Sequence, residues 1–94
     1  QTEAPKERMK KKDDQVLTVV ARAPFHIYYE GKAKVVSATN KVGTFDVLPG
    51  HADFFSVMSS GDVLIETETE TITIPTNSGI IGVRDDKVLL FINM

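Results

Sequence analysis

The sequence predicts an all-β fold: an antiparallel β-sandwich or flattened barrel of about eight to ten short strands. Three observations predict this class. From Val16 onward, apolar and polar residues alternate with a period of two, which is typical of half-buried strands. Turn-forming residues interrupt the alternation about every 8–12 residues. No stretch has a convincing helical period, so the apolar faces of the strands are expected to cover one another.

The first half of the domain is expected to contain four strands. Alternating apolar residues from Leu17 to Ala21 form the first, which Pro24 should end because proline has no donor for the strand ladder. Glu30-Gly31 should turn the chain after the second strand, and Leu48-Pro49-Gly50 should end the fourth in a tight turn. The strands after the first are expected over residues 25–29, 34–39 and 44–47.

The second half contains the clearest hairpin, from Val63 to Ile74, with Glu68-Thr69-Glu70 as its solvated tip. Ser78-Gly79 is expected to break the chain before the next strand. Asp85-Asp86 is expected to form a two-residue turn, because aspartate tolerates the left-handed conformation that such turns require. The other strands here are expected over residues 54–58, 80–83 and 88–92.

Composition excludes several classes of protein. The 94 residues are 41% hydrophobic, which suits one small domain. The absence of cysteine excludes disulfides, zinc-thiolate sites and thiol nucleophiles. A net charge of −2 argues against nucleic-acid binding as the main task. The longest apolar stretch, residues 88–92, is far shorter than the roughly 20 residues of a membrane helix.

Residues 1–14 differ in composition from the rest of the chain. They hold nine charges and one apolar side chain larger than alanine, Met9. Burial of so little apolar surface cannot offset the entropy of ordering the segment. We therefore expect a flexible charged arm over residues 1–14 and a single β-sandwich domain over residues 15–94.

The residues capable of catalysis are few. His26 lies among aromatic residues on an expected strand, which favours a packing role. His51 lies near Asp46 and Asp53, so a small hydrolase or metal enzyme would have to be built there. A zinc site needs three or four convergent ligands, and no second histidine lies near. We predict no enzyme activity, no catalytic, cofactor-binding or metal-binding residues, and no cofactor.

The aromatic residues have no basic stripe beside them, so stacking on nucleic-acid bases is not expected. A place in the hydrophobic core is predicted instead for Phe25, Tyr28, Tyr29, Phe45, Phe54, Phe55 and Phe91.

The segment from Gly43 to Asp53, GTFDVLPGHAD, resembles a pattern in the amino-terminal β-sandwich of the F-type ATP synthase epsilon subunit, called delta in mitochondria. In that family Leu-Pro-Gly-His-Ala-Pro follows a short strand and precedes an apolar one. The resemblance also includes residues 25–31, 77–81 and 88–91, and it spans about residues 16–93.

This resemblance implies a non-catalytic rotor-stalk subunit of a proton-translocating ATP synthase, which couples the membrane ring to the gamma subunit during ATP synthesis. The gamma subunit would face Pro49, Gly50 and His51, and the ring would face the loop of Val42, Gly43, Thr44 and Phe45. The subunit would associate peripherally with the cell membrane at its cytoplasmic face, or with the mitochondrial inner membrane at its matrix side. Such a subunit needs neither a nucleic-acid partner nor a membrane segment of its own.

An alternative stays open: a stand-alone β-sandwich protein-interaction module that reuses this scaffold. Its mark would be an exposed apolar or acidic groove unrelated to Pro49–His51.

Several positions depart from the family pattern. Asp46 stands where glycine is usual, Asp53 where proline is usual, and Thr44 where an acidic residue often meets the ring. The family also continues into a carboxy-terminal helical hairpin, which carries an inhibitory movement. Because this sequence stops at Met94, the hairpin is expected to be absent from it.

Overall fold

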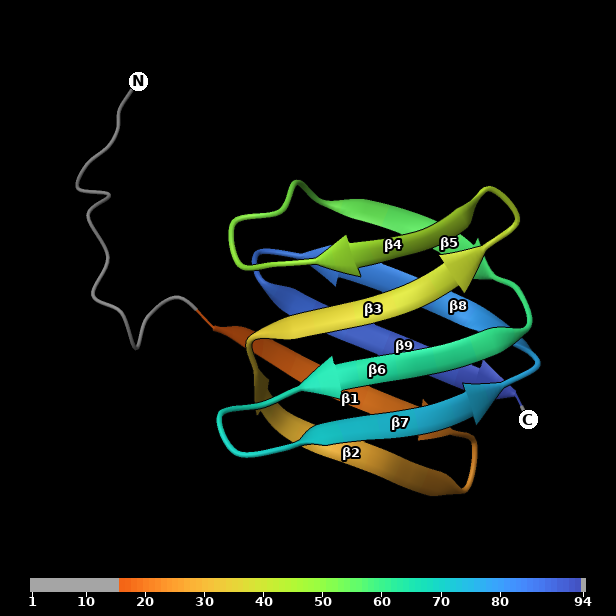
Figure 1. The fold of residues 1–94 in the computed structure, drawn as a ribbon, viewed down its shortest axis with the longest axis horizontal. Helices are drawn as coiled ribbons and strands as arrows, with labels where there is room; N and C mark the ends of the chain where they lie inside the picture. The colour runs from red at the N-terminus through yellow and green to blue at the C-terminus, as the bar shows by residue number, and fades with distance from the viewer. Residues whose placement is uncertain (1–15, 94) are drawn as a thin grey trace.

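Two stacked β-sheets make up the residues that the computed structural model describes, 16–93 (Figure 1). Within that range the chain forms nine strands and no helix, which confirms the predicted all-β sandwich. The predicted arm, residues 1–14, lies outside the described residues. The strands are β1 (Leu17–Ala23), β2 (His26–Ala33), β3 (Val35–Asn40), β4 (Gly43–Val47), β5 (Phe54–Met58), β6 (Gly61–Glu66), β7 (Thr71–Thr76), β8 (Ser78–Arg84) and β9 (Lys87–Asn93).

One sheet has five strands in the order β2-β1-β9-β8-β5, and the other has four in the order β4-β3-β6-β7. In Figure 1 the four-stranded sheet lies in front of the five-stranded one. Hairpins join β1 to β2, β3 to β4, β6 to β7 and β8 to β9, while the chain crosses from one sheet to the other after β2, β4, β5 and β7. β1 pairs with β9 in parallel, so the first and last strands of the domain lie side by side within the larger sheet.

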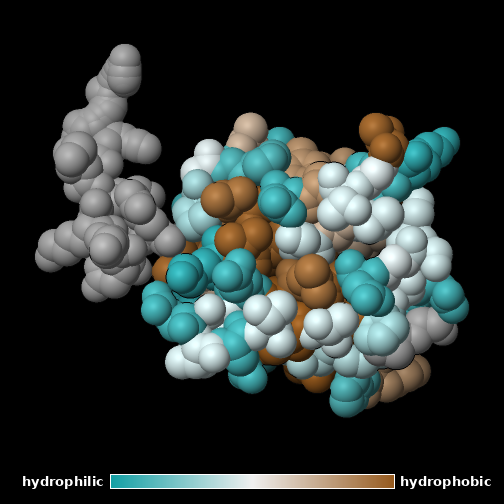
Figure 2. Space-filling view, in the orientation of Figure 1, coloured by the Kyte–Doolittle hydropathy of each residue, from teal (hydrophilic) through white to brown (hydrophobic). Residues whose placement is uncertain are grey.

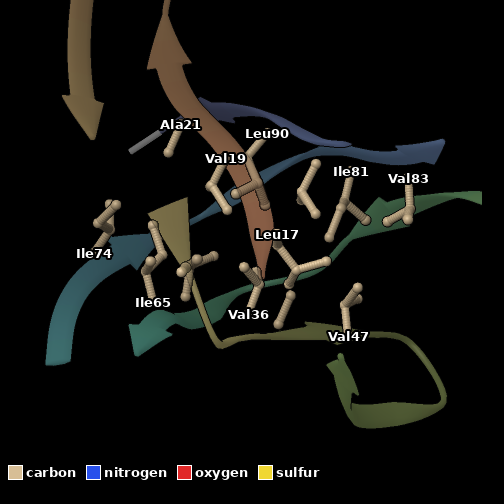
Figure 3. Packing of buried hydrophobic residues seen from close by; sticks show 14 of the residues in the cluster. Leu17, Val19, Ala21, Val36, Val47, Ile65, Ile74, Ile81, Val83 and Leu90 are labelled. Carbon is tan, nitrogen blue, oxygen red and sulfur yellow. The ribbon is translucent and has the colours of Figure 1, made fainter. Parts of the chain in front are cut away.

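The core lies between the sheets and is aliphatic. Alternate residues of most strands point inward, as the period of two predicts. In β2 a shift of register opposite Ala21 and Arg22 interrupts the alternation. Figure 3 shows Leu17 and Val19 of β1 and Leu90 of β9 directed toward Val36 and Ile65 of the smaller sheet. Each of these five side chains is completely buried. Burial of this contiguous cluster is the main force that holds the two sheets together.

The two predicted hairpin features of the second half are confirmed. β6 and β7 pair in register from Gly61↔Thr76 to Glu66↔Thr71, with residues 67–70 as the connecting tip. Asp85 and Asp86 have φ angles of 51° and 63°, the left-handed values that a two-residue hairpin turn needs. The turn joins β8 to β9 with Arg84 paired to Lys87.

The two predicted glycine breaks are wrong. Gly31 has extended backbone and stays within β2, where it pairs with Val19. The chain leaves the sheet later, at Lys34, whose N–H donates to the Glu66 carbonyl oxygen at 2.7 Å. Ser78-Gly79 likewise lies inside β8, and the crossing occurs at Asn77, whose N–H donates to the Asn93 carbonyl at 2.8 Å. Neither of these two crossings uses a left-handed glycine, because Lys34 and Asn77 carry the chain from one sheet to the other.

The predicted aromatic core is also wrong for three residues. Phe25 is fully exposed in the turn between β1 and β2, Phe55 is 69% exposed and Phe91 is 44% exposed. The space between the sheets is filled mainly by valine, leucine and isoleucine from the inward positions, with alanine and Met58. Tyr28, Tyr29, Phe45 and Phe54 pack at the margin of this cluster and are half-buried.

Candidate functional site

The segment Leu48–Asp53 carries the chain from β4 in one sheet to β5 in the other. It begins with a tight turn, in which the His51 N–H donates to the Leu48 carbonyl at 3.1 Å. Gly50 has a φ of 87°, a value that side chains disfavour, so glycine fits this turn. The turn leaves Pro49 half-buried and presents Gly50 and His51 at the surface.

The imidazole of His51 is held by two contacts. Its Nδ1 lies 2.7 Å from the Ala52 carbonyl oxygen, which accepts a hydrogen bond from a ring protonated at Nδ1. Its ring centroid lies 4.9 Å from that of Phe54, the first residue of β5. These contacts leave Nε2 as the nitrogen available to a partner.

A pair of hydrogen bonds ties this segment to the Asp85-Asp86 turn. The Gly50 N–H donates to Oδ1 of Asp86 at 2.8 Å, and the Asp85 N–H donates to Oδ1 of Asp53 at 3.0 Å. Each segment therefore donates one backbone N–H to a carboxylate of the other. The partners of these two hydrogen bonds lie 36 and 32 residues apart in the sequence, so no local sequence pattern predicts the contact.

The second predicted set, Val42 to Phe45, lies in and after the turn between β3 and β4. The Asn40 side-chain oxygen accepts hydrogen bonds from the N–H groups of Val42 at 2.9 Å and Gly43 at 3.2 Å, which closes the turn. Val42 is 93% exposed, and Gly43 and Thr44 are exposed as well. Phe45 points inward and is half-buried.

The two predicted sets lie at opposite ends of β4, and thus at opposite ends of the sandwich (Figure 1). One residue connects them. Phe54 contacts His51 on one side and packs edge-on against Phe45, with ring centroids 5.8 Å apart, on the other. Sequence reasoning assigned Phe54 to the core and missed this bridging position.

The outer face of the five-stranded sheet carries two rows of apolar side chains that sequence reasoning missed. The strand registers place Val20, Leu89 and Phe55 in one row, and Ile27, Phe91, Ile80 and Val57 in the next. The first row also contains Glu30 and Gly82, and the second also contains Arg22. Apolar residues at consecutive positions, as in Val88–Ile92, were the available signal, because they give a strand two apolar faces. Figure 2 shows the other side of the molecule, where brown areas are bordered by hydrophilic residues. Several of these apolar side chains are exposed, among them Phe55, Val57 and Phe91.

A groove of about 460 Å³ indents one end of this apolar face. Its lining includes Ala23, Pro24, Tyr28, Ile80 and Phe91. It lies where β8 begins and β9 ends, at the end of the sheet away from the Asp85-Asp86 turn and therefore away from Pro49–His51.

The structure does not assemble an acid–base or metal centre at His51 from the described residues. Asp46 accepts a hydrogen bond from the Ser37 hydroxyl at 2.7 Å on the outside of the four-stranded sheet, and Asp53 accepts the N–H of Asp85. Across residues 16–93 no three histidine, aspartate or glutamate side chains are grouped so that they could share a metal ion. The same range contains no helix with the length and apolarity needed to cross a bilayer.

Comparison with known proteins connects this geometry to a family. The family described as "ATP synthase, Delta/Epsilon chain, beta-sandwich domain" matches residues 12–93. The ATP synthase epsilon chain of Trichlorobacter lovleyi is 35% identical over 57 residues, which are 61% of this chain and 41% of that protein. The epsilon chain of Streptomyces griseus is 36% identical over 63 residues, which are 66% of this chain and 51% of that one.

Solved structures share the fold at low sequence identity. A chain of the Euglena gracilis mitochondrial ATP synthase, in a structure of OSCP/F1/c-ring, superimposes with a TM-score of 0.76 and 12% identity, covering 98% of this chain and 65% of that chain. A chain of the Tetrahymena thermophila mitochondrial ATP synthase, in a structure of the central stalk and c-ring, gives a TM-score of 0.71 and 14% identity. The latter match covers 83% of this chain and 63% of the Tetrahymena chain.

The matches with the two bacterial epsilon chains span only about two-fifths to half of the length of those relatives. The family match, in contrast, includes all nine described strands. The chain therefore belongs to the family of ATP synthase delta/epsilon β-sandwich domains.

Proposed function

We propose that this chain is the β-sandwich part of a central-stalk subunit of a proton-translocating F-type ATP synthase, where it couples the membrane ring to the gamma subunit. The family match over residues 12–93 carries the proposal. The names of the relatives support it, since they are epsilon chains, as do the central-stalk and c-ring assemblies in which the structural neighbours lie.

The proposed task is mechanical, and nucleotide chemistry takes place elsewhere in the complex. A body that transmits torque must resist shear between its strands, and ladders of backbone hydrogen bonds within each sheet provide that resistance. The close-packed aliphatic core keeps the two sheets from sliding. The subunit would associate peripherally, at the cytoplasmic face of a cell membrane or the matrix side of a mitochondrial inner membrane.

The two loops supply the proposed contacts. Pro49, Gly50 and His51 would face gamma, and the Val42–Phe45 loop would face the ring. Their positions at opposite ends of β4 support this division, because two partners can then bind without competing. Phe55 and Val57, on β5 immediately after the first loop, extend the exposed apolar area onto the sheet.

Replacing His51 with alanine is expected to weaken binding of the gamma subunit by about 1–2 kcal/mol, roughly 5- to 30-fold in Kd. The change removes an exposed ring and leaves the strands and core intact, so stability should change by less than about 1 kcal/mol. Isothermal titration of gamma into the domain measures the affinity. His26→Ala is the matched control, because His26 is also exposed but starts β2 at the other end of the sandwich. Equal affinity for wild type and His51→Ala would remove His51 from the interface.

Replacing Val42 with aspartate is expected to leave the domain folded and weaken its attachment to the ring. The side chain is 93% exposed, so the charge costs less than about 0.5 kcal/mol of stability. At a ring contact the same charge would have to be desolvated. Co-purification of gamma and this domain with the detergent-solubilised ring measures the effect, with Lys41→Asp as the control at the neighbouring exposed position. Retention of both variants on the ring would contradict this placement.

A second function is favoured by one observation. The apolar groove lined by Tyr28, Ile80 and Phe91 lies at the end of the sheet away from Pro49–His51, which is the mark expected of a stand-alone protein-interaction module. The gamma titration separates the two functions. A domain that fails to bind gamma in its wild-type form would favour the module, and binding that depends on His51 would favour the stalk subunit.

A further inference from the structure

We infer that Asp53 and Asp86 are positioning residues, which lock the loop Pro49–His51 into the shape it presents to the gamma subunit. This inference rests on the proposed function, because it concerns the loop assigned there to gamma. Neither carboxylate needs to touch gamma for this role. Both act through the backbone of segments that they bridge.

The hydrogen-bond geometry is reciprocal. Asp86 accepts the N–H of Gly50, the central residue of the loop, at 2.8 Å. Asp53, two residues after the loop, accepts the N–H of Asp85 at 3.0 Å. Two bridges that run in opposite directions fix both the distance and the relative orientation of the loop and the turn, which a single bond would not do.

The turn is itself a rigid support. Its backbone is tied to β1, because the Thr18 N–H donates to the Asp86 carbonyl at 2.9 Å. On its two sides, Arg84 pairs with Lys87 in the ladder of β8 and β9. The Asp86 carboxylate therefore extends from the larger sheet to the loop, and connects the loop to strands near the middle of that sheet.

The loop needs this support because its own bonds are local. The turn hydrogen bond from His51 to Leu48 closes four residues, and the His51 ring contacts its neighbours Ala52 and Phe54. Phe54 pairs with Val83 of β8, but none of these contacts involves Asp85 or Asp86 of the β8–β9 turn. A loop that is ordered before binding loses less entropy when gamma docks, so the bridges raise affinity without making a contact of their own. Carboxylates suit the task because charged acceptors make stronger hydrogen bonds than neutral ones.

Asp85 provides a matched control within the same turn. It shares the left-handed backbone of Asp86, with φ of 51° against 63°, so alanine strains both positions alike. Its carboxylate, however, accepts none of the hydrogen bonds found among residues 16–93. A difference between Asp86→Ala and Asp85→Ala thus isolates the bond to Gly50 from turn strain and from loss of charge.

The experiment titrates the gamma subunit into the full chain and its variants by calorimetry. Asp86→Ala is expected to raise the Kd about tenfold relative to Asp85→Ala, at closely similar melting temperatures. Asp86→Asn should recover most of the affinity, because asparagine keeps a side-chain oxygen acceptor and tolerates the turn. At the other bridge, Asp53→Ala should likewise weaken gamma binding, and Asp53→Asn should recover most of the affinity.

Amide hydrogen exchange reports the bridges directly. The Gly50 amide should exchange about tenfold faster in Asp86→Ala, and the Asp85 amide about tenfold faster in Asp53→Ala. Equal gamma affinities for Asp86→Ala and Asp85→Ala would overturn the inference and leave the stalk function standing. Failure of the wild-type chain to bind gamma would overturn the proposed function, and the inference with it.

Discussion

Gly79→Ala is expected to destabilise the domain by at least about 3 kcal/mol, a large part of the roughly 5–15 kcal/mol that holds such a domain folded. A Cβ at this position would lie 2.1 Å from the carbonyl oxygen of Phe91 and 2.8 Å from Cε of Met58. The terminal methyl group of the Met58 side chain could move aside. The carbonyl oxygen cannot, because it belongs to the backbone of the neighbouring strand β9, so relief would require β8 and β9 to separate.

Thermal and urea unfolding followed by circular dichroism measure this effect. A loss of 3 kcal/mol corresponds to a fall in melting temperature of more than about 10 °C for a domain of this size. Gly82→Ala is the control on the same strand, since its new Cβ would meet only Phe55 Cδ1, at 4.0 Å. That variant should stay within about 1 kcal/mol of wild type. If both variants unfold at the wild-type temperature, the close approach of β8 and β9 at Gly79 is wrong.

Gly79 also shows why part of the fold escaped prediction. In the sequence, Ser78-Gly79 looks like a strand break, because glycine is common in turns. Gly79 instead allows the backbone of β9 to approach β8 closely at Phe91. Phe91 lies 12 positions away in the sequence, so no local sequence pattern indicates this contact. Asp85-Asp86, in contrast, was predictable. The conformation needed there is local, and aspartate, which tolerates it, stands between Arg84 and Lys87 at the ends of two strands.

The period of two predicted the strands but could not assign the core where both faces of a strand are apolar. In Val88–Ile92 every residue is apolar, and only the register with β1 and β8 decides that Leu90 is buried while Phe91 is exposed. The aromatic residues were predicted to lie in the core because no basic stripe accompanies them. The narrow space between two sheets accepts branched aliphatic side chains, and Phe25 and Phe55 remain outside.

The candidate site was predictable only where it is contiguous in sequence. The turn at Pro49–Gly50 and the exposed loop at Val42 follow from local residue types, and the structure places both at the surface. The support from Asp86 is not local, since 36 residues separate it from Gly50. Long-range hydrogen bonds of this kind depend on strand order, which alternation alone does not determine.

Leu90→Ala is expected to cost about 2–5 kcal/mol, because it opens a cavity in the most constrained part of the core. β9 is the central strand of the five-stranded sheet, and Leu90 is completely buried between Ala21 of β1 and Ile81 of β8 in the register. The strands on both sides are fixed by their own ladders, so the surrounding chains cannot collapse into the space. The cost should therefore lie in the upper part of this range.

Leu89→Ala, at the adjacent residue, is the control for this prediction. The same atoms are removed from the same strand, but Leu89 faces outward and is 42% exposed, so the loss should be about 1 kcal/mol or less. Urea unfolding of the two variants measures the difference. A Leu90→Ala variant no less stable than Leu89→Ala would mean that β9 presents its other face to the core, because a shift of one residue in register exchanges the faces of a strand.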